Sequence, residues 1–187
     1  MVALYVVLGL VALIVLYLIA LYNGLVAKRQ QVNESFSGID VQLKLRQNLV
    51  PNLVDTVKGY AAHERDTLEE VIQARNSAMA ANGPADSAAA EGMLSAALGK
   101  LFALSEAYPD LKANTNFLQL QNELSQIEDK IAASRRFYNS AVGDFNTAIE
   151  QFPAVMLASG WGFTQREFFD LGEEDRATMS VVPEVKF

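Results

Sequence analysis

The chain has 187 residues, no cysteine, and 15 Lys and Arg against 22 Asp and Glu, which gives a formal charge of −7. The lack of cysteine excludes disulfides, iron–sulfur clusters and thiolate catalysis. Because an acidic chain without a basic face offers nothing to phosphates, we expect no nucleic-acid partner.

The first element in chain order is an apolar stretch over residues 2–22, which contains no charged residue and no proline. As a helix it spans about 31 Å, the thickness of the hydrocarbon core of a bilayer. A signal peptide would have a basic start, a shorter apolar run and small residues before the cleavage site. A core helix this long without a charge would be unusual in so small a chain. We therefore predict a single uncleaved transmembrane anchor over residues 1–27, in contact with the lipid bilayer.

The orientation of this anchor follows from the nearest basic residues. Lys28 and Arg29 come directly after the apolar stretch, and no Lys or Arg precedes it. The positive-inside rule then predicts an N-terminus outside and a domain in the cytoplasm. The opposite orientation stays open, because large domains can be translocated despite a bias of two residues.

Beyond the anchor the apolar pattern is helical, and no stretch alternates like a half-buried strand. The clearest segment covers residues 114–152, where apolar and small residues are separated by steps of three and four, as in coiled coils. Asn114 can cap its start, and Pro153 closes its end. The seam consists of Phe117, Leu120, Leu124, Ile127, Ile131, Ser134, Tyr138, Ala141, Phe145, Ala148 and Phe152.

Breakers upstream divide the rest of the chain. Asn82-Gly83-Pro84 separates two segments, and Pro109 ends the second of them. An unbroken helix over residues 28–82 would run about 82 Å and could not pack beside shorter neighbours. We therefore predict a turn near Pro51 and helices over residues 26–49, 51–82, 86–108 and 114–152, the first continuous with the anchor. These form an all-α, up-and-down four-helix bundle over residues 28–153, followed at 154–187 by an aromatic turn and an irregular acidic tail.

The sequence contains no pattern of residues that predicts catalysis. A di-iron bundle needs two Glu-x-x-His pairs, but His63 is the single histidine and has Tyr60 at that spacing. Gly-x-Ser-x-Gly and phosphate-binding loops are absent as well. We predict no catalytic, cofactor-binding or metal-binding residue, and a protein that is not an enzyme. The run from Glu173 to Asp175 could attract a cation, although such runs are usually solvated.

Two polar clusters are unusual for a plain bundle. The first runs from Asp40 to Arg46 and the second from Arg135 to Asn139, with Asn146 further along the same helix. Asn is a poor helix former, so its presence inside a predicted helix needs an explanation. One interpretation is a polar network or a partner surface. The other is that Arg and Asn side chains bond helix ends and turns around Pro51.

The sequence resembles the LemA family over nearly its whole length. The matching residues are Tyr22-Asn23-Gly24, Ile39 to Lys44, Leu49-Val50-Pro51-Asn52, Val57 to Ala61, His63-Glu64, Arg136-Phe137-Tyr138-Asn139, Phe152-Pro153 and Val182 to Phe187. Phe36 stands where the family commonly has Trp. The resemblance implies a small bacterial membrane protein with one N-terminal span and a bundle arranged like that of a bromodomain. It implies no family-wide activity or cofactor, so no functional residues carry over.

Two hypotheses of function follow. The first is a non-enzymatic scaffold or adaptor in the bacterial inner membrane that forms homo-oligomers or docks membrane-protein partners. It is motivated by the anchor, by the small residues Ala20 and Gly24, and by aromatic residues beyond the predicted bundle: Trp161, Phe163, Phe168 and Phe169. The alternative is a membrane-anchored module that binds or senses a small ligand or cation in the bundle or the acidic tail.

Overall fold

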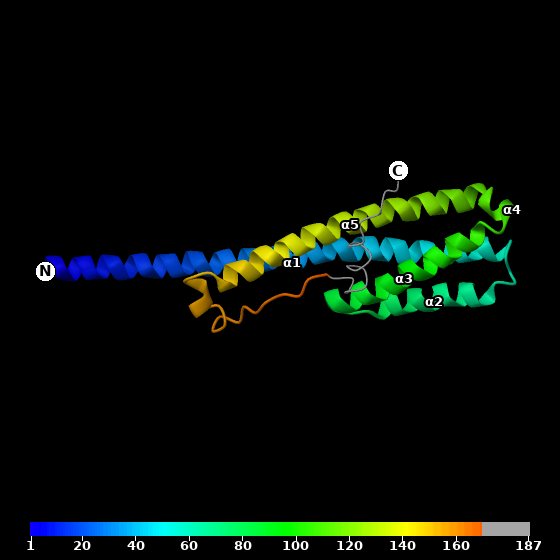
Figure 1. Ribbon diagram of the computed structural model, residues 1–187. Helices are drawn as coiled ribbons and strands as arrows, with labels where there is room; N and C mark the ends of the chain where they lie inside the picture. The colour runs from blue at the N-terminus through cyan, green and yellow to red at the C-terminus, as the bar shows by residue number, and fades with distance from the viewer. Residues whose placement is uncertain (170–187) are drawn as a thin grey trace, which may run out of the picture.

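The computed structural model describes residues 1–169 of the chain. Its helices are α1 (Val2–Lys58), α2 (Arg65–Ala80), α3 (Gly83–Ser105), α4 (Pro109–Lys112) and α5 (Thr115–Glu150), with a 3-10 turn, η1 (Ala154–Met156). No strand occurs within residues 1–169. α1 runs away from the N-terminus, α2 returns, α3 runs away again and α5 comes back along α1 (Figure 1). The predicted all-α fold, with a long apolar helix leading into an up-and-down bundle, is confirmed.

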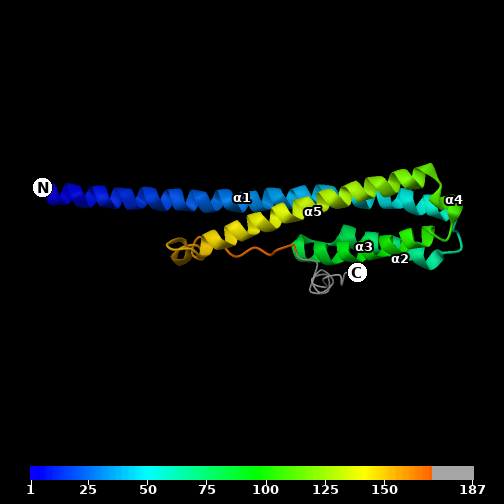
Figure 2. The ribbon, with the colours of Figure 1, turned by 45° about the horizontal axis from the view of Figure 1, so that its top comes forward.

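The bundle consists of two helix pairs of unequal length. α1 packs mainly against α5 and α2 against α3, and both views show the shorter pair beside the distal half of α1 only (Figures 1 and 2). From their residue numbers α5 is about 54 Å long, but α2 and α3 are about 24 and 35 Å. Two core clusters result. One, around Val50 and Leu101, lies far from the N-terminus, at what we call the distal end of the bundle. The other, around Leu25 and Phe145, lies nearer the apolar N-terminal part of α1, on what we call the membrane side.

The N-terminal part of α1 stands free of the bundle. Its most apolar window has a mean hydropathy of 3.0, and none of it is buried against other parts of the fold. A core helix would have its side chains covered, so the core-helix alternative does not describe this segment. Within residues 1–169, α1 is the one helix whose length and composition suit it to cross a membrane.

The predicted turn near Pro51 is wrong. α1 continues unbroken through Pro51 to Lys58, and the chain turns at residues 59–64. A proline within a helix leaves the carbonyl four residues earlier without its donor. That carbonyl belongs to Gln47, and Arg75 of α2 donates to it from Nε at 2.7 Å. A side chain on the neighbouring helix therefore supplies the hydrogen bond that Pro51 cannot. The length argument excluded an unbroken helix to residue 82 but misplaced the turn, which lies at residues 59–64 and not at Pro51.

The later helices lie close to their predicted positions. The segment predicted over 86–108 forms α3, while Pro109 and Asp110 begin the single-turn α4. The segment predicted over 114–152 forms α5, and the Asn114 side chain accepts a hydrogen bond from the Phe117 backbone N–H at 3.0 Å, as a cap should. The predicted seam of α5 is buried or half-buried apart from its last member, Phe152, which is exposed.

The chain after α5 folds back along the membrane-side half of the bundle. We call residues 151–163 the tip lobe and residues 164–169 the strap. The lobe packs on α1, where the centre of the Tyr22 ring lies 5.4 Å from the centre of the Trp161 ring and 5.6 Å from that of the Phe163 ring. Phe163 and Phe169 are buried and Trp161 is half-buried, whereas Phe168 is exposed. The expectation that these four aromatics lie outside the bundle is therefore wrong for the two buried rings. Residues 170–187, which include most of the predicted acidic tail, lie outside the described residues.

Candidate functional site: a buried ionic network and an open groove

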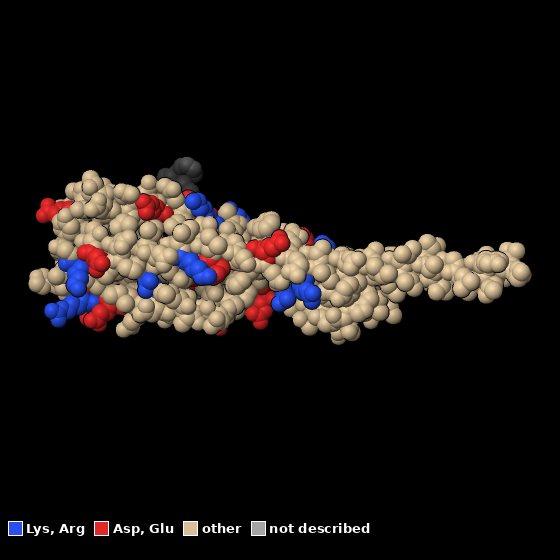
Figure 3. Space-filling view, turned by 180° about the vertical axis from the view of Figure 1, so that it is seen from behind, with Lys and Arg blue, Asp and Glu red and all other residues tan. Residues whose placement is uncertain are grey.

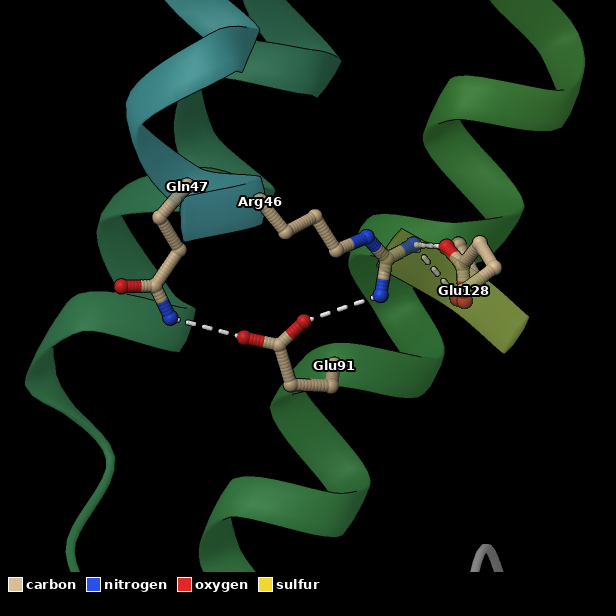
Figure 4. A network of polar contacts seen from close by, with 5 residues as sticks. Arg46, Gln47, Glu91 and Glu128 are labelled. Atoms are coloured by element: carbon tan, nitrogen blue, oxygen red, sulfur yellow. Dashed lines mark hydrogen bonds and ion pairs between the residues drawn. The ribbon is translucent and has the colours of Figure 1, made fainter. Parts of the chain in front are cut away.

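Arg46 is the centre of a buried polar network. Its side chain is 2% exposed, and its two terminal nitrogens lie 2.9 Å from Glu91 Oε2 and 2.7 Å from Glu128 Oε1. The second nitrogen also donates to Ser95 Oγ at 2.7 Å, and Gln47 donates to Glu91 Oε1 at 2.7 Å. Figure 4 shows these side chains converging from α1, α3 and α5. The network therefore joins three helices of the bundle.

The electrostatics of this network centre on Glu91. Burial raises the pKa of the Glu91 carboxyl above its ordinary value of 4.5, although the hydrogen bond from Gln47 and the charge of Arg46 act in the opposite direction. Glu128 differs because its side chain is 44% exposed, so water shares its charge. Arg46 Nε is buried without a hydrogen-bond partner. The guanidinium serves mainly to compensate the buried carboxylate of Glu91.

A cavity of about 280 Å³ borders the network. It is lined by Leu43, Arg46, Glu91, Gly92, Ser95, Ala96, Ile131, Arg135 and Phe169. The Arg135 guanidinium lies over the Phe169 ring, 5.5 Å from its centre. The charged groups that line this cavity thus already have partners within the chain. This arrangement is that of a network that holds helices together.

The first polar cluster of the sequence has separate inner and outer parts. Arg46, with the adjacent Gln47, belongs to the core network, whereas Asp40 and Lys44 form an exposed ion pair at 2.6 Å one turn apart on α1. Asn48, which precedes Pro51, is exposed. The interpretation as a polar network therefore holds for the inner residues of this cluster.

The second polar cluster holds the strap in place. The amide of Asn139 both donates to and accepts from the Phe169 backbone, at 3.1 and 2.8 Å. Asn146 does the same with the Arg166 backbone, at 2.9 and 2.8 Å. Tyr138, whose hydroxyl pKa is raised by burial, donates to the Glu167 carbonyl at 2.8 Å. These asparagines bind an extended segment and not the turns around Pro51, so that part of the second interpretation is wrong. Outside both clusters, Arg75 donates to the mid-helix Gln47 carbonyl that Pro51 leaves without a backbone donor.

The outer face of the α1–α5 pair carries a groove of about 360 Å³. It is lined by Gln31, Glu34, Ser35, Gly38, Ala133, Ser134 and Phe137. Apart from Phe137, the α5 wall is made of small side chains. The Phe137 ring is 59% exposed, and Val41 and Leu45 are exposed further along α1. Sequence reasoning placed Phe137 only in a polar cluster and missed this groove, because a groove depends on two helices being placed together.

Metal ligands and the lone histidine give no further site. Within residues 1–169 no three His, Cys, Asp or Glu side chains are grouped so that they could hold a metal ion. His63 is exposed in the turn between α1 and α2. The run from Glu173 to Asp175 lies outside the described residues.

Comparison with known proteins identifies relatives over most of the chain. The model of the LemA family matches residues 35–187. Magnetosome protein MamQ of Magnetospirillum gryphiswaldense is 29% identical over 189 residues, covering 87% of this chain and 69% of that protein. Magnetosome protein MamQ 2 of Paramagnetospirillum magneticum is 29% identical, with 79% of this chain and 64% of that protein covered. Protein LemA of Metamycoplasma hominis is 28% identical over 82% of this chain and 71% of its own. The chain thus spans about two thirds of the length of these relatives.

Proposed function

The chain belongs to the LemA family, and on that premise we propose that it is a non-enzymatic, membrane-anchored scaffold that pairs with a second copy of itself. The anchor is the free N-terminal part of α1, and the bundle is its rigid continuation because one unbroken helix contributes to both. Copies anchored in one bilayer share an orientation and a plane. Their outer faces therefore meet at a raised effective concentration.

A stripe along α1 supports a parallel pairing. Its positions alternate steps of three and four residues, the spacing of a coiled-coil seam. Every member is exposed: Ala20, Gly24, Ala27, Gln31, Glu34, Gly38, Val41 and Leu45. The stripe contains small residues in its membrane-side part, where close helix approach is favoured, and Val41 and Leu45 further out. It borders the groove because Gln31, Glu34 and Gly38 belong to both.

The observation that carries the proposal is an exposed Phe137 ring that lines a groove whose α5 wall otherwise consists of small residues. In a two-fold symmetric pair each surface meets its own copy, so a projecting group on one can fill a hollow on the other. A groove of about 360 Å³ has room for a phenyl ring. Phe137 of each copy would thereby leave water, and aromatic anchors in pockets are the groups that dominate interface energies.

Cysteine cross-linking tests this pairing in membranes, since the chain has no native cysteine. Val41→Cys is expected to give disulfide-linked dimers on mild oxidation. Ile72→Cys, at a similarly exposed apolar position on α2, is the matched control and should stay monomeric. Adding Phe137→Ser to Val41→Cys should lower the dimer yield several-fold, and adding Glu34→Gln should raise it by removing like charges from the seam. Equal cross-linking at Val41 and Ile72, or indifference to Phe137→Ser, would contradict the proposal.

We propose that the bundle lies in the cytoplasm, on the basis of Lys28 and Arg29 directly after the apolar stretch. We further propose that the membrane is the inner membrane of a bacterium, on the basis of the likeness to the LemA family. Ser77 is exposed on α2 and suits a topology probe. Ser77→Cys should remain unlabelled by an impermeant maleimide on intact cells and become labelled after the membrane is permeabilised. Labelling of intact cells would place the bundle on the outside.

A further inference from the structure

We infer that the tip lobe is a second membrane contact, with Phe152, Val155 and Met156 lying in the headgroup–acyl boundary beside the α1 span. The inference rests on the anchoring in the proposed function but not on the pairing. It concerns the opposite side of α1 from the stripe, because the lobe packs on residues such as Leu21, Tyr22 and Leu25.

The position of the lobe along α1 comes from its contacts. Ala154, Ala158 and Phe163 share a cluster with Leu25, and Leu21 and Trp161 pack against it. Leu18 and Leu21 are half-buried, although nearly all of the apolar stretch before them is exposed. Both ribbon views show η1 beside α1, on the side of the bundle nearest the N-terminus (Figures 1 and 2). The lobe contacts Leu21 and Tyr22, the last two residues of the predicted span, so it overlaps the end of that span.

The free surface of the lobe carries no charge, and its large hydrophobic side chains are exposed. Phe152 is 80% exposed and Met156 is 74% exposed, and Val155 between them is exposed as well. No charged residue occurs from Gln151 to Gln165. In Figure 3 the acidic and basic side chains lie over the bundle, while the part of the molecule toward the N-terminus is free of them. Exposed apolar groups clustered in this way mark an interaction surface.

The surroundings of the lobe suit a lipid interface in particular. Tyr22 and Trp161 form an edge-to-face pair at the end of the span, and these are the residues enriched where headgroups begin. The Arg29 guanidinium lies over the Phe163 ring, 5.1 Å from its centre, and Lys28 is next to it in sequence. Next to the apolar surface of the lobe come Tyr22 and Trp161, and then the basic residues Lys28 and Arg29. A bilayer leaflet has the matching order, with acyl chains followed by anionic headgroups.

A second contact would restrict the motion of the bundle. A lone helix is free to rotate about its own axis in the bilayer, and its tilt is set by interfacial anchors and neighbouring packing. The lobe is displaced to one side of that axis, so its insertion favours a tilt of α1 toward the lobe and fixes which face of α1 lies on the side of the tilt. The outer stripe then lies on the face of α1 that points away from the tilt.

Fluorescence quenching in liposomes tests the inference with the full-length chain. Single cysteines at Met156, Leu13 and Ser77 would be labelled with an environment-sensitive NBD dye, in vesicles with and without lipids spin-labelled near the headgroup end of the acyl chain. Met156 and Ser77 are both exposed, so neither substitution disturbs packing. We expect blue-shifted emission and strong quenching at position 156, and emission as in water with little quenching at position 77.

The two other labels separate the possible failures. Unquenched, water-like emission at position 156 together with a lipid-exposed position 13 would overturn the lobe contact and leave the anchor intact. Water-like emission at both positions would refute the anchoring itself. A blue shift at 156 without quenching by lipid would mean that protein covers the lobe, which also overturns the inference. As a second variant, Phe152→Ser with Met156→Ser should restore mobility to a spin label at position 155.

Discussion

Replacing Arg46 with methionine is expected to destabilise the bundle by about 3–5 kcal/mol, because it leaves a buried carboxylate without its counter-charge. The partner left behind is Glu91, whose side chain is almost as buried as that of Arg46. The measurement is urea unfolding of the protein in nanodiscs, followed by circular dichroism. Glu128→Gln is the matched control, and it should cost less than about 1 kcal/mol because that carboxylate is shared with water.

The double variant Arg46→Met with Glu91→Met should be markedly more stable than Arg46→Met alone, since it buries no unpaired charge. A double variant no more stable than the single one would mean that the network acts through packing and not through charge compensation.

The same network predicts a pH dependence of stability. The pKa of Glu91 is raised in the folded state, so between 4.5 and that folded pKa the folded protein binds more protons than the unfolded chain. The free energy of unfolding therefore falls as pH rises through this window. Arg46→Met removes two influences that lower the pKa of Glu91, namely the charge of Arg46 and its hydrogen bond. The loss of stability that this substitution causes should therefore grow with rising pH. In the double variant this growth should be absent.

Replacing Arg75 with alanine is expected to cost about 1–3 kcal/mol, because the Gln47 carbonyl then lacks any donor in a largely buried position. The effect depends on Pro51, which has no N–H to offer to that carbonyl. In a Pro51→Ala background the restored backbone N–H should reduce the cost of Arg75→Ala to less than about 1 kcal/mol.

The measurement for Arg75 is a double-mutant cycle of unfolding free energies. Arg65→Ala, which removes an exposed arginine from the same helix, is the control and should be nearly neutral in both backgrounds. If Arg75→Ala costs the same in the native chain and in the Pro51→Ala background, then Arg75 does not act by replacing the missing backbone hydrogen bond.

Helix boundaries set by local chemistry could be predicted from the sequence. Asn114 caps α5 with its own side chain, and Asn82-Gly83-Pro84 separates α2 from α3, because both signals act within a few residues. Periodic apolar positions likewise placed the seam of α5, because a buried stripe repeats at the helix period whatever its partner is.

Pro51 and Asn139 show where such reasoning stops. The cost of a proline in a helix depends on which group satisfies the freed carbonyl, and the donor Arg75 is on another helix. The two hydrogen bonds of Asn139 go to residue 169, so its role depends on a long-range contact. Phe152 followed the seam in sequence, yet α5 ends two residues earlier and leaves that ring in the open.

Four properties could be predicted from the sequence alone: the apolar span, the all-helical character, the family and the lack of any thiol chemistry. They depend on composition, on periodicity and on ordered motifs, which are properties of the sequence. Three other features required the folded chain: the helix that joins the span to the bundle continues past Pro51 to Lys58, Arg46 compensates Glu91, and the tip lobe comes to lie beside Tyr22. Each of these depends on residues far apart in sequence being brought together, and no local pattern encodes which groups will meet.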